Sequence, residues 1–214
     1  MNSLCAPCSS RRSLGLVVGL LLGLLFGFPA PAEAKLFELY AQAQGGAAYG
    51  DGVAGVQKDA AFFAAARGGA YGARVGAEFL FLDGWVEHNQ HTDGALLGTW
   101  TQFMLGIDAD FPMGNTPVAK AKLFGELGVA IGFGLGTGQQ VMPPLDASEL
   151  TDRGFLAQLG LGLDYRLAKL VSIGFSVPVT YGYLFKQGVA NDEANQYQSV
   201  WAEALVHVRL YLEL

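Results

Sequence analysis

The sequence predicts an all-β fold: an eight-stranded antiparallel up-and-down β-barrel that crosses a membrane. The first observation is alternation. From Lys35 onward, long segments alternate apolar residues with polar residues or glycine, which places the two sets on opposite faces of a strand. The second is the character of the polar face, which carries charges, glycine and small polar groups, as expected for a barrel with lipid outside and a polar interior. The third is an export signal at the N-terminus.

The N-terminal segment has the three parts of a secretory signal peptide. Arg11 and Arg12 form a positive region, 14–28 is an apolar stretch, and Ala32-Glu33-Ala34 supplies a small-x-small cleavage site. We therefore expect a signal peptide over 1–34, cleaved after Ala34, and a single barrel domain over 35–214. This organisation predicts a protein of the bacterial outer membrane.

The bulk composition excludes several classes of function. The chain of 214 residues has a formal net charge of −6, which argues against nucleic acid as a partner because nucleic-acid binding needs a basic surface. The part after the signal has no apolar run that approaches the roughly 20 residues of a spanning helix. Both cysteines, Cys5 and Cys8, fall in the expected signal, so we expect no disulfide, and no motif indicates a cofactor.

The alternation places eight strands along the mature chain. The clearest is the last, where Val206, Val208 and Leu210 share one face and His207 and Arg209 share the other. Barrels of single-chain bacterial proteins have an even number of strands, so the alanine-rich segment 58–67 is taken as a strand, with a short helix as its alternative. The expected strands are about 36–47, 58–67, 70–82, 97–111, 119–135, 153–166, 170–185 and 199–214. Pro178 predicts a bulge or local break in its strand, because proline donates no ladder hydrogen bond.

The connections are expected to alternate in length. Segments 112–117 and 168–169 are short, whereas 83–95, 136–152 and 186–198 are long and polar. Outer-membrane barrels have short periplasmic turns and longer external loops, so the long segments are expected outside the cell. This assignment also puts Phe79 and Phe81 in an outer aromatic girdle.

This pattern resembles the small eight-stranded outer-membrane barrels, of which the OmpA transmembrane domain is the familiar member. The resemblance covers nearly the whole mature sequence, but it is one of strand pattern and not of a specific motif. Members usually end in an aromatic residue that the barrel-assembly machinery reads, whereas this sequence ends Leu212-Glu213-Leu214. The sequence also lacks the peptidoglycan-binding domain that follows the barrel in larger relatives.

The inward face is expected to carry a network of charged side chains. An eight-stranded barrel is just wide enough to be filled by side chains, and buried charges need partners. Paired charges would then form a structural plug, and the alternative is a narrow or gated ion path. The predicted members of the network are Glu38, Arg74, Glu78, Asp108, Asp110, Lys122, Glu126, Asp164, Arg166, Arg209 and Glu213.

A second candidate is the polar cluster Glu87, His88 and His91, which falls in the expected external loop 83–95. Histidine and carboxylate side chains can bind a transition metal, but the order is not the H-E-x-x-H of a zinc hydrolase. The competing interpretation is a solvated polar loop that faces lipopolysaccharide. No metal site is therefore assigned.

The sequence favours an outer-membrane protein with a structural or surface-interaction role and no open pore. The alternatives are a narrow channel for small solutes or ions and a lipid A-modifying barrel enzyme; no catalytic set is evident, so no enzymatic activity is expected. A soluble calyx with the same strands is disfavoured, because only 15% of the residues are charged. The expected partners are outer-membrane lipids and lipopolysaccharide, the barrel-assembly machinery, and surface ligands reached through the long loops.

Overall fold

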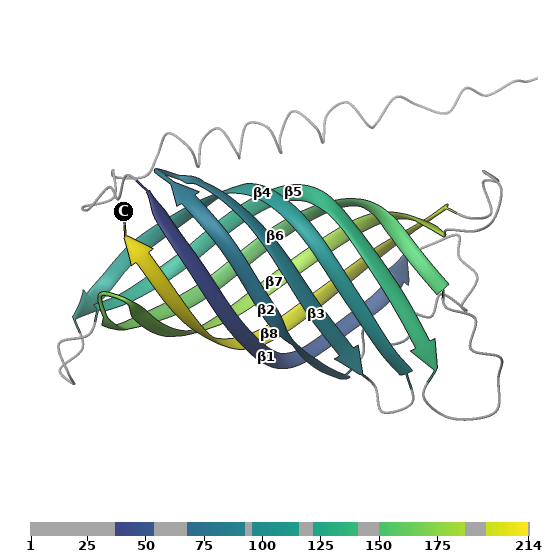
Figure 1. Ribbon diagram of the computed structural model, residues 1–214, viewed down its shortest axis with the longest axis horizontal. Coiled ribbons are helices and arrows are strands. Elements are labelled where there is room, and N and C mark those ends of the chain that lie inside the picture. Colours follow the sequence, from purple (N-terminus) through teal and green to yellow (C-terminus); the bar gives the residue numbers. More distant parts are fainter. Residues whose placement is uncertain are drawn as a thin grey trace, which may run out of the picture. The chain divides into compact units, whose positions relative to one another are not determined.

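The computed structural model describes residues 37–53, 68–92, 96–115, 122–140, 150–186 and 196–213. These residues form one closed antiparallel barrel (Figure 1). Its strands are β1 (Glu38–Val53), β2 (Gly68–Phe79), β3 (Leu82–Thr92), β4 (Leu96–Asn115), β5 (Lys122–Gln140), β6 (Leu150–Ala168), β7 (Val171–Lys186) and β8 (Gln196–Glu213). No helix in these ranges is long and apolar enough to cross a membrane.

Each strand pairs with its neighbours in sequence, and β8 closes the sheet against β1 (Figure 1). We call the end that holds Glu38 and the β2–β3 and β6–β7 turns the turn end, and the opposite end the loop end. A path of register partners that leaves β1 at Glu38 returns to it twelve residues further on, at Gly50. Stagger, strand tilt and barrel width are linked, so this offset fixes a strongly tilted wall around a lumen that side chains must fill.

The predicted eight-stranded barrel is confirmed, and most strands lie within a few residues of their expected ranges. The external loop expected over 83–95 is wrong, because Leu82–Thr92 is strand β3. Alternation failed here because Glu87, Asn89 and His91 point into a polar lumen, while His88 and Gln90 on the outer face are polar too. The expected strand 58–67 and the expected signal 1–34 lie outside the described residues.

The β2–β3 connection is a two-residue turn made by Leu80 and Phe81. Leu80 has a φ of 58°, a left-handed conformation that is uncommon for a bulky residue. The backbone N–H of Asp108 donates to the carbonyl of Phe81 over 3.1 Å, which ties the turn to β4. Strand β2 ends at this turn, whereas the strand expected over 70–82 led to an external loop. Phe79 and Phe81 therefore lie at the turn end and not in an outer girdle.

The ladder of the described strands is irregular at three places. The pairing of β7 with β8 runs to Ser176 and resumes at Val179, in unchanged register, so Pro178 causes the predicted local break. On its other side Pro178 keeps its pairing with Gly160 of β6. Separate register shifts fall in β4 between Pro112 and Gly114 and in β6 between Arg166 and Ala168, both near the turn end.

The two faces of the barrel wall have inverted polarity. The outward side chains are largely apolar and exposed; examples are Ile131 (70% exposed), Leu161 (55%) and Val206 (57%). The inward side chains include many buried polar and charged residues, such as Glu38 (1%), Glu87 (1%) and His207 (1%). A water-soluble protein shows the opposite arrangement, since charged groups are almost never buried unless they are paired.

Candidate functional site in the barrel interior

The inward face of the strands at the turn end carries one cluster of hydrogen-bonded side chains around Arg209. Its Nη1 lies 2.9 Å from Oε1 of Glu126, and its Nε donates to Oε1 of Gln42 over 2.8 Å. Nearby, the hydroxyl of Tyr211 donates to Oδ2 of Asp164 over 2.7 Å. Arg209 also reaches the Tyr211 hydroxyl at 3.3 Å, so the cluster joins strands β1, β5, β6 and β8.

A second cluster lies in the loop half of the lumen around Glu87. Arg74 forms an ion pair with Glu87 at 2.6 Å across the β2–β3 ladder. Gln44 Nε2 donates to Glu87 Oε1 over 2.8 Å and to Asn89 Oδ1 over 2.9 Å. His91 Nε2 lies 2.8 Å from Oε1 of Glu203, a residue of β8 on the far side of β1. Each carboxylate of this cluster therefore has a hydrogen-bonding or ionic partner.

Two glutamines on β1 connect the clusters. Gln42 Nε2 donates to Gln44 Oε1 over 2.7 Å, and both side chains are buried. Together with the Arg209–Gln42 and Gln44–Glu87 contacts, this bond makes one continuous polar network along the lumen. Arginine does not lose its proton in proteins, and an amide is a fixed donor and acceptor, so these links suit a structural network and not a proton relay.

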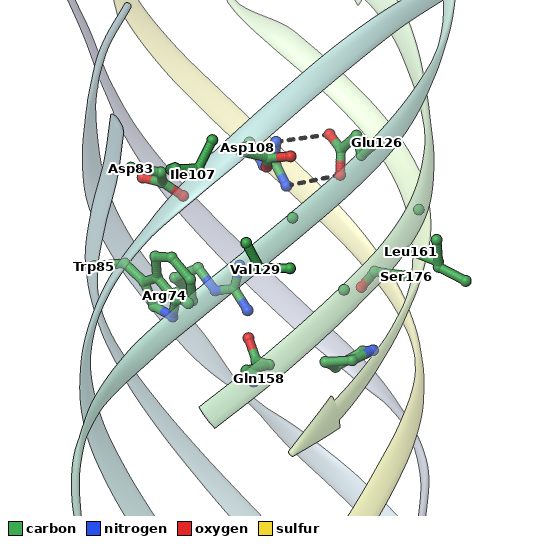
Figure 2. Close-up of a pocket in the computed structure, with 16 residues that line it drawn as sticks. Arg74, Asp83, Trp85, Ile107, Asp108, Glu126, Val129, Gln158, Leu161 and Ser176 are labelled. Atoms are coloured by element: carbon green, nitrogen blue, oxygen red, sulfur yellow. Dashed lines mark hydrogen bonds and ion pairs between the residues drawn. The ribbon is translucent and has the colours of Figure 1, made fainter. Parts of the chain in front are cut away.

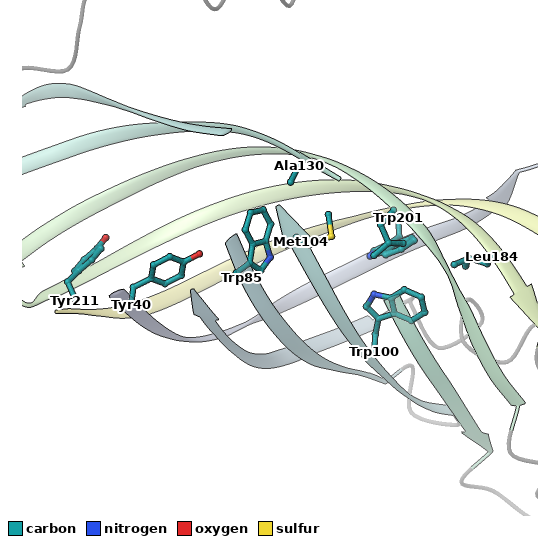
Figure 3. Packing of buried hydrophobic residues seen from close by; sticks show 9 residues of the cluster. Tyr40, Trp85, Trp100, Met104, Ala130, Leu184, Trp201 and Tyr211 are labelled. Atoms are coloured by element: carbon teal, nitrogen blue, oxygen red, sulfur yellow. The ribbon is translucent and has the colours of Figure 1, made fainter. Parts of the chain in front are cut away.

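An apolar layer fills the loop half beside this network. Trp100 and Trp201 pack edge to face with ring centroids 5.7 Å apart, and each is 2% exposed. Figure 3 shows them beside Leu184, with Met104 and Trp85 further toward the turn end. A Cβ at Gly134 would lie 2.0 Å from the ring of Trp100, so glycine is what makes room for the indole. The two rings pack inside the lumen, in its loop half.

Between the clusters lies a small cavity of about 50 Å³ (Figure 2). Arg74, Asp83, Asp108 and Glu126 line it together with Trp85. The hydroxyl of Tyr40, which packs outside this lining, donates to the Asp83 carboxylate at 3.0 and 2.9 Å. The cavity is large enough for buried water, and its ring of polar groups suits it.

The structure places the predicted interior residues whose side chains it describes on the inward face, mostly toward the turn end. Arg166 lies 3.4 Å from Asp110, and its guanidinium stacks 4.6 Å from the centroid of the Tyr211 ring. Arg74 is instead part of the loop-half cluster. Register pairs Glu38 with both Glu78 and Glu213, and Asp108 lines the cavity near Glu126. Lys122 and Glu213 are strand residues whose side chains lie outside the described set.

The cluster of Glu87, His88 and His91 is not a loop site, and the strand divides it. Glu87 and His91 are buried in the lumen, whereas His88 lies on the outer face with Nδ1 2.8 Å from Thr101 Oγ1. Period-two geometry explains the division, because positions 87 and 91 share one face and 88 takes the other. Among the described residues, no group of three or more histidine, cysteine, aspartate or glutamate side chains is arranged to hold a metal ion.

Sequence reasoning missed four residues of the network. The amides Gln42, Gln44 and Asn89 and the carboxylate Glu203 were not among the predicted site residues, yet they supply the links that join the charged groups. The signal for the two glutamines was available in the inward set of β1, where they occupy alternate positions after Glu38 and Tyr40. A search for charged side chains alone passes over the three amides.

The lumen also holds residue types found in hydrolases, but not in their arrangement. Ser172 donates to the Tyr211 hydroxyl over 3.2 Å, and His207 Nε2 lies 3.5 Å from Asp164. A hydrolytic triad places histidine between the nucleophile and the carboxylate. Here the histidine faces the carboxylate and not the serine, and all three side chains are buried.

Comparison with solved structures gives the class of fold. Neisserial surface protein A (NspA) has a similar structure, with a TM-score of 0.53 and 14% sequence identity over 80% of this chain and 96% of that chain. Ail, the attachment invasion locus protein of Yersinia pestis, has a TM-score of 0.39 at 8% identity, covering 83% of this chain and 99% of its own. The outer membrane protein OprG from Pseudomonas aeruginosa has a TM-score of 0.36 at 10% identity, covering 85% and 98%.

The likeness to the neisserial protein establishes the fold: the chain is a small eight-stranded β-barrel of the outer-membrane type. No protein-family model matches the chain, and no curated protein sequence matches it significantly. What the barrel does must therefore be argued from its own surfaces.

Proposed function

We propose that this protein is an integral outer-membrane barrel with a closed lumen and a structural or surface-interaction role. The observation that carries the proposal is the inverted polarity of the wall. Exposed Ile131, Leu161 and Val206 form part of an outward apolar belt, which water would disfavour and hydrocarbon accepts. A closed barrel also pairs every strand, as spanning a bilayer requires.

The packed interior supports a closed lumen. The continuous polar network runs along the lumen from Arg209 through Gln42 and Gln44 to Glu87. The Trp100–Trp201 pair packs in the loop half. A path for hydrated ions would need these contacts to separate, and the remaining cavity of about 50 Å³ is too small for a solute pathway.

The same features favour a non-enzymatic protein. The buried Ser172, His207 and Asp164 are in the wrong order for nucleophilic catalysis. On the outer wall His88 contacts Thr101, but its Nε2 has no described partner to orient the ring as a base. Our proposed partners are therefore outer-membrane lipids and lipopolysaccharide, with surface ligands at the loop end and the barrel-assembly machinery during insertion. Export by a signal over 1–34, cleaved after Ala34, is part of this proposal.

Two measurements on the purified full-length protein test it. In lipid vesicles the folded barrel should stay with the membrane and migrate differently on a gel before and after boiling. In planar bilayers it should give no stable unit conductance. A soluble protein with no mobility shift would refute the membrane location, and a stable conductance from the unaltered protein would instead indicate a narrow channel.

A matched variant makes a negative conductance result informative. Trp100→Ala with Trp201→Ala removes both indole rings, together with the hydrogen bond from Trp100 Nε1 to Gln102 Oε1, and keeps Arg209, Gln42, Gln44 and Glu87. This variant should leak small ions if it still shows the mobility shift of a folded barrel. If a folded variant remained sealed, the tryptophans would not be what closes the lumen.

A further inference from the structure

The outward face of β2 to β5 carries a polar patch near the loop end, built from three hydrogen-bonded pairs. Tyr71 donates to Gln90 over 2.6 Å, His88 contacts Thr101 at 2.8 Å, and Thr99 contacts Thr137 at 2.6 Å. Each pair consists of direct register partners on adjacent strands. We call these residues the outer polar seam: Tyr71, His88, Gln90, Thr99, Thr101 and Thr137.

The length of β3 places the seam at membrane level, because the whole strand is needed to cross a bilayer. A tilted strand needs roughly 9–11 residues to cross a bilayer, and β3 has 11 residues. Its outward positions start with Leu82, Gly84 and Val86, and then become His88, Gln90 and Thr92. If β3 spans the membrane as proposed above, three of its six outward positions are polar within the span or at its edge.

The apolar belt adjoins the seam directly. Thr101 has His88 as its partner on β3 and Leu135 as its partner on β5, and Leu135 is an exposed apolar residue. Two positions toward the turn end, Phe103 pairs with Phe133, which packs against Phe155 with ring centroids 6.1 Å apart. The seam is thus a polar indentation in the upper edge of the belt, and not a part of the wall far above it.

The chemistry of the seam identifies what covers it. The Gln90 amide nitrogen and the His88 Nε2 have no hydrogen-bond partner within the described parts of the chain, so both can bond to a neighbour outside the wall. The outward positions of β2, β3 and β4 contain no lysine or arginine, which does not suit a phosphate ligand. Neutral donors and acceptors beside a tyrosine complement sugar hydroxyls.

We propose that the outer polar seam binds the sugar head groups of outer-leaflet glycolipids, which reach lower along β2 to β5 than along the rest of the wall. This inference rests on the proposed membrane location. It assigns to one face of the barrel a lipid contact that the apolar belt alone does not provide.

Single spin labels test the proposal. Cysteine replaces Ala73, whose register partner is His88, or Ala204 on β8 as the matched control. Cys5 and Cys8 are changed to serine, so that any chain that keeps residues 1–34 carries no second label. Both alanines are outward and exposed, so neither change removes a seam residue. Each nitroxide-labelled protein is placed in phosphatidylcholine vesicles alone, with digalactosyl diacylglycerol, or with phosphatidylglycerol.

The neutral galactolipid should slow the nitroxide at position 73 several-fold while leaving position 204 unchanged. Phosphatidylglycerol should do neither, and His88→Leu with Gln90→Leu should abolish the slowing while preserving the mobility shift of the folded barrel. Equal behaviour at both sites, or equal slowing by the anionic lipid, would overturn the proposal. Spin–spin broadening at position 73 would show that a second copy covers the seam.

Failure of the membrane location gives a different result. In that case both labels would be accessible to an aqueous nickel relaxant, and this inference would fall with it. If only the seam proposal is wrong, the label at position 204 still reports hydrocarbon, with high oxygen and low nickel accessibility.

Discussion

Arg74 and Glu87 face each other across β2 and β3 inside the lumen, with Nη2 and Oε2 2.6 Å apart. Glu87 is 1% exposed and also accepts hydrogen bonds from Gln44 and Asn89. Glu87 is the acceptor that joins the loop-half cluster to the β1 glutamines. Substitutions of Arg74 and Glu87 therefore measure how much the network contributes to the free energy of unfolding.

Arg74→Met should destabilise the barrel by about 3–5 kcal/mol, because it leaves a buried carboxylate without its cation. The double variant Arg74→Met with Glu87→Leu should recover much of the loss, since apolar side chains of similar volume often replace a buried pair at little cost. Urea unfolding in detergent micelles measures both. A double variant no more stable than the single one would show that Glu87 matters through its other contacts. His88→Ala, one residue away on the outer face, is the control and should change stability little.

Gly134→Ala should destabilise the barrel by about 1–3 kcal/mol, as overpacking does. The added Cβ would lie 2.0 Å from the Trp100 ring, which Trp201 holds in place from the other side. Gly160→Ala is the matched control, because its Cβ would find only the Gly128 carbonyl, at 3.9 Å. Comparable losses for the two variants, measured by thermal unfolding, would mean that the wall and not the tryptophan sets the requirement for glycine.

Leu80→Gly should stabilise the barrel by about 1 kcal/mol. At a φ of 58° the leucine side chain is strained and glycine is not. Leu80 is also 43% exposed, so little apolar burial is lost. Phe81→Gly, at the other turn position, should destabilise, since Phe81 has no positive φ to relieve. Denaturant midpoints of both variants decide the matter, and a lower midpoint for Leu80→Gly would contradict the argument.

Ile131→Arg should cost about 2–4 kcal/mol, because it places a charge in the middle of the outward belt. Thr137→Arg on the same strand lies near the loop end and should cost no more than about 1 kcal/mol. Unfolding in phospholipid vesicles compares them. If both substitutions were equally mild, Ile131 would face water, and the membrane location would be wrong.

The sequence predicted the barrel because most strands have a strong contrast between their two faces. Leu159, Leu161 and Leu163 alternate with Gly160 and Gly162, a set of glycines that would be too bare for a soluble surface. Strand β3 escaped prediction because its loop-end half lacks that contrast. The turn before it also carries no glycine, asparagine or proline, since Leu80 occupies the left-handed position.

The interior was predictable in its composition but not in its connections. Parity of position places Arg209 and Glu126 on inward faces, and their contact at 2.9 Å depends on the stagger between β5 and β8 across the lumen. Alternation within a strand carries no information about that stagger. For the same reason the meeting of Gln44 with Glu87 could not be read from residues 43 positions apart.

The pairing of β1 with β8, which closes the barrel, affects the order of folding. Gln42 and Gln44 stand on the first strand, and their contacts reach Glu87 on the third and Arg209 on the last. An open sheet that has not yet joined these edges exposes backbone groups along β1 and β8 and leaves Arg209 apart from Gln42, both costly in hydrocarbon. Closure satisfies both at once, so partly closed intermediates should be sparsely populated and insertion should proceed as a single cooperative step.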